Sequence, residues 1–268
     1  MLNADSFFTI GKTHQVCQDY AVSSPQGDYI VVSDGCSSVP DTDIGARLLV
    51  KKAEEYLRLL HYGRTYDFNS LPNFSILGAL DCTQSLEIRK SCLSATLLLA
   101  CRDGNIVETI VSGDGFVVGR FRETGDLHIY QYHYESGAPF YLYYTLTEES
   151  TNNYFLDFGT TRTVTSTRVF SDSRSPIVAS WNEDANFFFG PGFSLDQYDL
   201  IVLGTDGLAS FISCSSLVSA IDVIQELLAF KTYQGEFVQR RCRRVFELFQ
   251  EIGWINTDDV AVAAIFSI

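Results

Sequence analysis

The chain has neither a long apolar segment nor a basic character, and these two absences exclude several classes of protein. No apolar run approaches the ~18–20 residues that a membrane span requires. The N-terminus, MLNADSFFTIGK, has no basic stretch followed by an apolar one, so we expect no signal peptide there. Lys and Arg number 19 against 33 Asp and Glu, which gives a net charge of −14. Nucleic-acid binding requires clustered cations that neutralise phosphates, so neither nucleic acid nor a membrane is an expected partner.

Paired cysteine motifs are also lacking. The seven cysteines are an odd number, lie far apart and include no CxxC pair. This pattern argues against a zinc ribbon and a disulfide scaffold, and it favours reduced thiols in a cytoplasmic protein. Cys92, Cys101 and Cys242 have apolar neighbours in the sequence and are expected in the core.

The chain does have enough apolar residues, 46% of 268, to form a sizeable core. No internal repeat, linker or low-complexity tract divides it. We therefore predict one mixed α+β domain over residues 1–268.

The first half of the chain predicts strands, two helices and more strands. DYAVSS and DYIVVSD flank the turn PQG and predict a β-hairpin. Residues 41–61 carry apolar side chains at helical spacing behind three N-cap candidates, Asp41, Thr42 and Asp43. A second helix is predicted over about 75–90. From 94 to 132 the turns DGN, GDG and TGD predict an antiparallel meander.

The second half is less regular. Residues 131–195 are rich in Tyr, Thr, Asn and Phe without a long helical pattern, which predicts short strands and loops. Helices are predicted at about 215–230 and 235–252, followed by a final strand in DDVAVAAIFSI. In the last helix the inward residues should be Phe237, Val245, Phe249 and Ile252. Its other side carries a cluster that is expected to be solvated rather than to bind a partner: Arg240, Arg241, Arg243 and Arg244.

Several apolar strands end or begin at an acid. Runs of β-branched residues stop at Asp34, Asp114 and Asp206, each followed by glycine, and the last strand opens at Asp258-Asp259. If these strands pair in one core, their carboxylates meet and repel one another, which raises their pKa values. A divalent cation relieves that repulsion, and oxygen ligands favour Mg²⁺, Mn²⁺ or Ca²⁺ over zinc. Ordinary Asp-Gly turns and an acidic surface that aids solubility are the alternative explanation.

Motifs along most of the chain resemble those of the protein phosphatase 2C family of metal-dependent Ser/Thr phosphatases. They are, in order, GKTHQVCQDYAV, VVSDGCSS, TDIGARLLVKKA, SATLLL, VSGDGFVVGR, LIVLGTDGLASF and TDDVAVAAI. The resemblance runs from about residue 11 to residue 266 and is weakest between 128 and 195. It looks closest to a bacterial branch with H and CQD in the N-terminal motif, where most members have an arginine and ED.

The resemblance implies a fold and a set of metal ligands. The fold would be a four-layer αββα sandwich, in which two antiparallel sheets pack face to face with helices outside. Asp34 would bridge two Mn²⁺ or Mg²⁺ ions, and the carbonyl of Gly35 would touch the second. Asp206 and Asp258 would complete the shell of the first ion, and Asp19 would act near the second. Asp114 would help to hold a third, weaker ion. Asp259 would contact the metal ligands without binding an ion itself.

Two positions depart from the family pattern. Gln18 replaces a glutamate that usually binds the second metal, which should weaken that site. His14 replaces the arginine that grips the substrate phosphate, so its contact would depend on pH near the ordinary histidine pKa of about 6.5. His14 could also protonate the leaving group, or it could be a structural, hydrogen-bonded histidine. Lys12 could supply some of the missing positive charge, and a Cys17 nucleophile paired with His14 is disfavoured.

The function implied is hydrolysis of phosphoserine and phosphothreonine by a water activated between two metal ions. The partners implied are a phosphorylated protein and a Ser/Thr kinase that phosphorylates it in signalling, and the protein is expected to be a monomer. A Tyr-rich segment within about 131–195 is the candidate for the variable flap of the family, and the alternative is that its aromatic residues belong to the core. The main alternative is a catalytically weak or inactive regulatory module, and a Ca²⁺-stabilised structural protein is less favoured.

Overall fold

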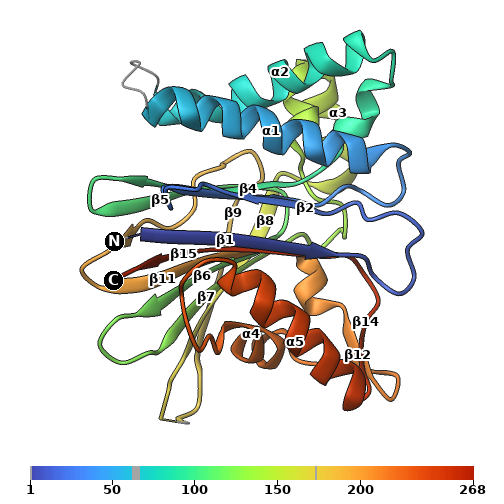
Figure 1. Cartoon of the computed structure of the whole chain (residues 1–268). Helices are drawn as coiled ribbons and strands as arrows, with labels where there is room; N and C mark the ends of the chain where they lie inside the picture. The colour runs from blue at the N-terminus through green and yellow to red at the C-terminus, as the bar shows by residue number, and fades with distance from the viewer. Residues whose placement is uncertain (1, 62–66, 173) are drawn as a thin grey trace.

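Two antiparallel sheets lie face to face between two pairs of helices (Figure 1). The computed structural model describes residues 2–61, 67–172 and 174–268. The seven-stranded sheet has the order β1-β15-β11-β6-β7-β8-β9, and the five-stranded sheet has the order β10-β5-β4-β3-β2. Helices α1 (Thr42–His61) and α2 (Leu71–Ser85) cover the smaller sheet, while α4 (Ala220–Leu228) and α5 (Phe237–Glu251) cover the larger one. The predicted four-layer αββα sandwich is therefore confirmed.

The strands are short and mostly buried. In the larger sheet they are β1 (Leu2–Thr9), β6 (Gly115–Phe121), β7 (Leu127–His133), β8 (Thr161–Val169), β9 (Ile177–Asp184), β11 (Tyr198–Gly204) and β15 (Val260–Ser267). In the smaller sheet they are β2 (Tyr20–Ser23), β3 (Tyr29–Ser33), β4 (Leu97–Asp103), β5 (Ile106–Ser112) and β10 (Phe193–Ser194). A three-stranded sheet contains β12 (Phe211–Ser213), β13 (Ser216–Leu217) and β14 (Trp254–Asn256). The remaining helix is α3 (Glu148–Phe158).

Alternating side chains divide the apolar core into layers. Along β3, Ile30 and Val32 pack between the sheets, while Val31 packs under α1. Along β11, Ile201 faces the other sheet and Val202 faces α5. Because both faces of these strands are covered, they read as continuous apolar runs in the sequence rather than as alternating ones. The same burial leaves the ends of these strands as the place where polar side chains can gather.

The predicted elements are mostly present, with shifts at their ends. The hairpin is β2–β3, paired from Tyr20–Ser33 to Ser23–Ile30. The helix predicted at about 75–90 is α2, which begins earlier because Pro72 is accommodated in its first turn. The helix predicted at 215–230 begins at Ala220, since a turn and β13 occupy residues 214–217. Ile252 was placed wrongly in the core: it follows α5 and is 52% exposed.

Two predictions for the middle of the chain are wrong in form. The meander of residues 94–132 is split, because β4 and β5 pair in the small sheet while β6 and β7 pair in the large one. The chain crosses between the sheets at Gly113-Asp114, which a local pattern cannot reveal. The segment 131–195 is not made of short strands and loops alone. It contains α3 and two long paired strands, β8 and β9.

The structure also shows the state of the cysteines and the character of the helices. All seven cysteines are unpaired, and Cys92 and Cys242 are buried, while Cys101 is only partly buried. Within residues 2–61, 67–172 and 174–268, none of the helices combines the length and the apolar character needed to cross a bilayer.

Candidate functional site

Acidic side chains from five segments lie at one end of the sandwich because strand ends meet there. Asp34 follows β3, Asp206 follows β11, and Asp114 lies between β5 and β6. Asp19 precedes β2, and Asp258 and Asp259 precede β15. In the antiparallel pairs, Ser33 stands opposite Tyr20 and Gly204 opposite Val262, so each strand end lies beside a strand start. We call the following residues the carboxylate cluster: Asp19, Asp34, Asp114, Asp206 and Asp258.

The carboxyl groups of the cluster are close enough to perturb one another. The carboxyl group of Asp34 lies close enough to those of Asp19 and Asp206 for each to perturb the other. Burial, followed by the charges of Asp19 and Asp206, raises the pKa of Asp34 well above its ordinary range. Burial and then the charge of Asp258 raise the pKa of Asp206 to about 6. Two carboxyl groups in contact can share a proton, whereas two ionised ones repel. The cluster therefore favours either protons or a cation.

Asp114 joins the cluster through the crossing between the sheets. The two glycines that flank it, Gly113 and Gly115, have φ angles of 90° and 133°, which side-chain-bearing residues rarely adopt. A Cβ on Gly115 would lie 2.7 Å from the carbonyl oxygen of Gly204, so the crossing passes directly over the end of β11. Burial and then the charge of Asp206 raise the pKa of Asp114. The GDG motif thus places the carboxyl group of Asp114 at the point where the chain passes from one sheet to the other.

Asp19 is the most enclosed member of the cluster. The residue is 1% exposed, and its Oδ2 accepts a hydrogen bond of 2.6 Å from the hydroxyl of Thr205. The backbone N–H of Ala261 donates to the same hydroxyl at 2.9 Å. The other carboxylate oxygen of Asp19, Oδ1, is buried and has no protein donor. Burial is the main reason why the pKa of Asp19 is raised. A buried carboxylate oxygen that lacks a donor is a position for a cation.

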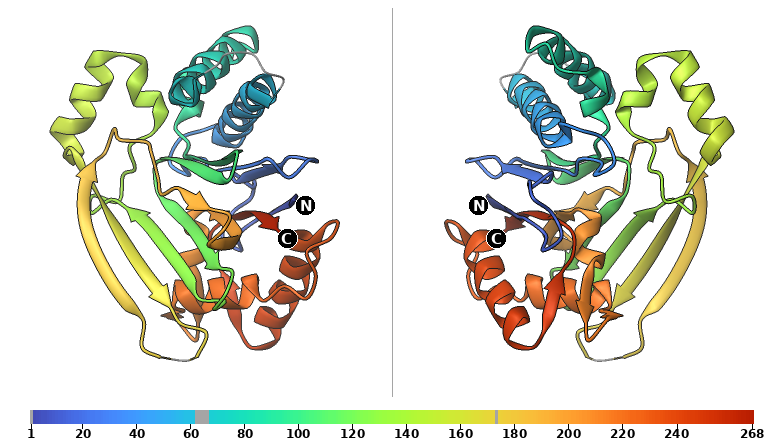
Figure 2. Two further views of the ribbon diagram at one scale, coloured as in Figure 1. Left: turned by 90° about the vertical axis from the view of Figure 1, so that its left-hand side faces the viewer. Right: turned by 90° about the vertical axis from the view of Figure 1, so that its right-hand side faces the viewer.

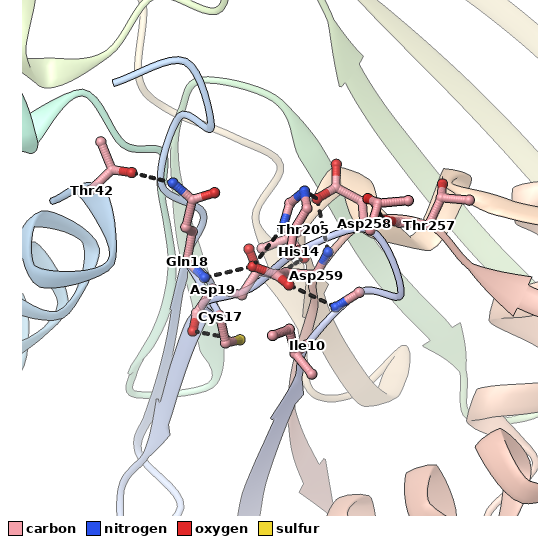
Figure 3. A network of polar contacts seen from close by, with 12 residues as sticks. Ile10, His14, Cys17, Gln18, Asp19, Thr42, Thr205, Thr257, Asp258 and Asp259 are labelled. Carbon is pink, nitrogen blue, oxygen red and sulfur yellow. Dashed lines mark hydrogen bonds and ion pairs between the residues drawn. The ribbon is translucent and has the colours of Figure 1, made fainter. Parts of the chain in front are cut away.

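Asp259 holds the N-terminal loop against the start of β15 (Figure 3). Its two oxygens accept hydrogen bonds from the backbone N–H groups of Gly11, at 2.7 Å, and of Gln18, at 2.5 Å. Its side chain is fully buried. Gly11 is required here because a Cβ would lie 2.3 Å from the carbonyl carbon of Asp258. Asp259 therefore positions the loop that carries His14, Gln18 and Asp19.

His14 lies between two carboxylates. Its Nε2 is 3.3 Å from Asp258 Oδ1, and its Nδ1 is 3.1 Å from Asp259 Oδ2. The Nδ1 contact has the distance of an ion pair but not the alignment of a hydrogen bond. The side chain is 19% exposed, so one edge of the ring reaches solvent. His14 therefore stands beside the carboxylate cluster, with both ring nitrogens facing acids.

Gln18 points towards the start of α1 (Figure 3). Its Nε2 donates to Thr42 Oγ1 at 2.6 Å and to the carbonyl oxygen of Cys36 at 3.4 Å. The Thr42 hydroxyl in turn bonds the carbonyl oxygen of Cys36 at 3.0 Å. The amide of Gln18 thus ties the N-terminal loop to the turn after β3.

That turn places Asp34 and Gly35 against neighbouring backbone. The backbone N–H of Asp34 donates to Thr96 Oγ1 at 2.9 Å, and that of Gly35 donates to the carbonyl oxygen of Gln18 at 3.2 Å. A Cβ on Gly35 would lie 2.6 Å from the carbonyl oxygen of Thr42. The close approach of α1 therefore requires glycine at position 35.

The donor set of the cluster fits a hard divalent cation, although the carboxyl groups would have to separate to surround it. Across the part of the chain that the structure describes, no group of three or more Asp, Glu, His or Cys side chains already has the geometry of a metal site. The acids instead lie close to one another, as Asp34 does to Asp19 and Asp206. All the donors are oxygens, which is the chemistry preferred by Mg²⁺, Mn²⁺ and Ca²⁺.

Three residues of the site were not identified from the sequence. Thr205 bonds Asp19, and Thr96 bonds the backbone of Asp34. Both lie inside motifs, GTDG and SATLLL, but nothing in a motif shows which carboxyl group a hydroxyl will reach. Tyr141 is 6% exposed, and burial raises the pKa of its hydroxyl, as do the neighbouring Cys36 and Asp114. It comes from the segment 131–195, where the sequence pattern was weakest.

Solved structures share this fold across almost the whole chain. PppA, described as a regulatory component of the type VI secretion system (T6SS) in Pseudomonas aeruginosa, is 14% identical and has a TM-score of 0.53, over 100% of this chain and 98% of its own. The catalytic domain of PstP, a serine/threonine phosphatase in complex with two manganese ions, is 15% identical, with a TM-score of 0.51 over 99% and 97%. Stp1 from Staphylococcus aureus, a serine/threonine phosphatase, is 13% identical, with a TM-score of 0.52 over 100% and 96%.

The family to which the chain belongs is shown by a family model, because similarity to these solved structures shows the fold alone. Comparison with proteins of curated function gives no match. The family model described as protein phosphatase 2C matches residues 11–241, which is most of the chain. The resemblance seen in the motifs is confirmed, and so is the class of enzyme that the sequence predicted. The chain belongs to the protein phosphatase 2C family, whose members are protein-serine/threonine phosphatases.

Proposed function

We propose that this chain hydrolyses phosphoserine and phosphothreonine in proteins with two Mn²⁺ or Mg²⁺ ions bound by its carboxylate cluster. The observation that carries the proposal is the convergence of Asp19, Asp34 and Asp206 from three separate parts of the chain, with the buried Oδ1 of Asp19 left without a donor. Their mutual repulsion is relieved when a divalent cation replaces the shared protons.

Each acid has a separate role in this proposal. Asp34, whose carboxyl group is perturbed by that of Asp19 and itself perturbs that of Asp206, would help to hold both ions, together with the carbonyl of Gly35. Asp206 and Asp258 would hold the first ion and Asp19 the second. Asp114 would hold a third, weaker ion. Bound there, the ions would neutralise phosphoryl charge and lower the pKa of a water between them.

The remaining residues would position this machinery. Asp259 holds the loop that presents Asp19, and Thr205 orients the Asp19 carboxylate. His14, between Asp258 and Asp259, would contact the substrate phosphate or protonate the leaving alkoxide. Gln18 would act as a weak, uncharged ligand or as a support for the ligands.

The test is Mn²⁺-dependent hydrolysis of a phosphopeptide by the wild type and by Asp206→Asn. We expect the substitution to lower kcat/KM by at least about 100-fold, the scale on which a single charge-stabilising group acts. Asp81→Asn, which alters an exposed acid on α2, is the matched control and should leave the rate unchanged. Equal, metal-independent rates in all three proteins would refute the proposal.

A second candidate function is that of a regulatory or binding module with weak catalysis. The replacement of a charged metal ligand by Gln18, and of the arginine that grips the substrate phosphate by His14, favours it. Calorimetric titration with Mn²⁺ separates the two functions: two sites favour catalysis, and the absence of binding favours the regulatory module. The physiological substrate would be a protein that a Ser/Thr kinase has phosphorylated. The segment 131–195 would influence which phosphoprotein the enzyme accepts.

A further inference from the structure

The larger sheet ends in a strand whose second edge carries no partner strand among the described residues. β9 pairs with β8 over eight residues, from Thr161–Asp184 to Arg168–Ile177, and is the last strand of its sheet. Figure 2 shows β8 and β9 along the outer margin of the molecule, with no other strand beyond them. An unpaired edge presents a row of backbone N–H and C=O groups that can bind another strand.

The side chains of β9 do not protect this edge. Ile177 is 61% exposed, Val178 is 60% exposed and Trp181 is 45% exposed. Between Ile177 and Asn182 the strand, IVASWN, has no charged residue and no proline. Lysine, proline and inward-pointing charges are the usual means by which proteins block a sheet edge. This edge is therefore open to pairing.

One face of β9 continues the apolar interior of the sandwich. Trp181 stands opposite Val164 of β8, and Val164 is fully buried in the core between the sheets. Ile177, Ala179 and Trp181 share that face because side chains alternate along a strand. The opposite face is more polar, with Ser180 bonded to Thr165 and Asn182 bonded to Thr163. An added strand would bring apolar side chains to the first face and polar ones to the second.

We propose that β9 pairs antiparallel with β9 of a second copy of this chain, in a two-fold dimer centred on Ala179. In this register Ile177 stands opposite Trp181 of the copy, and Val178 stands opposite Ser180 of the copy. A two-fold interface must be complementary to itself. A register centred on Ser180 would instead set Ile177 against Glu183, a poorer match. The dimer joins the two larger sheets into one continuous sheet.

Charge complementarity supports the same register. When Ala179 is on the axis, the acidic end of β9, Glu183-Asp184, faces the segment of the copy that precedes its β9 and carries Arg174. Arg174 is 63% exposed at its side chain, and its own partner is Asp172 at 2.8 Å. No acid meets an acid in this pairing. Opposite charges across a strand pair stabilise it, whereas like charges oppose it. The same eleven residues, 174–184, thus determine the register of the proposed dimer and contribute to its free energy of association.

The first experiment tests the axis by crosslinking. In a Cys214→Ser background, which removes an exposed thiol, Ala179→Cys places two sulfurs opposite each other. Directly opposed residues have Cα atoms about 4.5–5.5 Å apart, within the range that a disulfide spans. We expect a covalent dimer on mild oxidation. Asn182→Cys is the matched control, since its opposite residue is Pro176, and it should form no covalent dimer.

The second experiment tests the charges by sedimentation velocity. Arg174→Asp and Asp184→Arg should each weaken the wild-type dimer, because each sets like charges face to face, and the double exchange should restore it. Ala179→Asp should abolish it by opposing two carboxylates on the axis. A wild type that stays monomeric at high concentration, or a dimer unaffected by Ala179→Asp, would overturn the proposal. A monomer that instead binds an extended peptide along β9 would also overturn it. Phosphatase activity is not needed for any of these readouts, so failure here is distinct from failure of the proposed function.

Discussion

At the scale of the residue, the acids of the site are held by polar groups that lie far from them in the chain. Asp34, Asp206 and Asp258 could be predicted because each interrupts an apolar strand at a recognisable motif. The bond from Thr205 to Asp19 joins residues 186 positions apart, and the bond from Gln18 to Asp259 joins residues 241 apart. Such contacts depend on the complete fold, so one sequence without structure does not reveal them. The position of His14 between two acids is of the same kind.

Gln18→Glu tests whether position 18 is next to a metal. The new carboxylate should bind Mn²⁺ more tightly, so that the Mn²⁺ concentration for half-maximal activity falls by up to about 10–100-fold, the range seen when groups around a metal are altered. The same change removes the N–H donor to Thr42 and sets a carboxylate beside the carbonyl oxygen of Cys36. We therefore expect the metal-free variant to be less stable by about 1–3 kcal/mol. Gln18→Met, which keeps the length and lacks the charge, should lose stability without gaining affinity. An unchanged or higher Mn²⁺ requirement for Gln18→Glu would contradict this placement.

At the scale of the element, long periodic segments were predictable and segments that depend on distant partners were not. α1 has an apolar face of many residues and was predicted within one residue of its ends. β1 was not predicted at all, because it forms by pairing with β15, the last strand of the chain. α3 was missed for a different reason. Only Tyr154 of its residues is buried, so its helical period is nearly absent from the sequence.

Thr147→Ala tests the stability of α3 and its relation to substrate choice. The Thr147 hydroxyl oxygen caps the helix by accepting from the backbone N–H of Ser150 at 3.1 Å. Its loss should cost about 1 kcal/mol and speed hydrogen exchange of the α3 amides. If this segment selects the substrate, KM for a phosphopeptide should rise while the hydrolysis of a small aryl phosphate stays unchanged. Thr147→Ser, which keeps the cap, is the control. Slow exchange retained in Thr147→Ala would argue against the cap.

At the scale of the whole molecule, the carboxylate cluster costs stability when it holds no cation. The pKa of Asp206 is raised to about 6, against an ordinary value of 3.8, and those of Asp19, Asp34 and Asp114 are also raised. For such groups the folded state binds more protons than the unfolded state. The free energy of unfolding therefore falls as pH rises from about 4 through 6, and further where the other acids lose their protons. The α+β sandwich was predictable because it follows from the order of the motifs, whereas this cost depends on three-dimensional burial.

Thermal unfolding of the protein, kept free of metal by a chelator, tests whether the empty carboxylate cluster lowers stability. Its Tm should decrease between pH 5 and pH 8, and Mn²⁺ at about 100 times its Kd should restore about 2.7 kcal/mol of stability at the higher pH. Asp206→Asn should raise the Tm of the metal-free protein, because a repelling charge is gone, and its free energy of unfolding should increase by an amount on the order of 1–3 kcal/mol. The same variant should respond less to Mn²⁺. A metal-free Tm that rises with pH would show that the acids do not share protons in the folded state.

The strand pairing between the two ends of the chain has a consequence for biosynthesis. β15 pairs with β1 on one side and with β11 on the other, and it delivers Asp258 to the cluster. During synthesis the hairpin β2–β3 can form early, but the carboxylate cluster lacks Asp258 until the segment that ends in β15 has left the ribosome. The cluster is therefore complete only once the larger sheet can form, because both depend on the same strand.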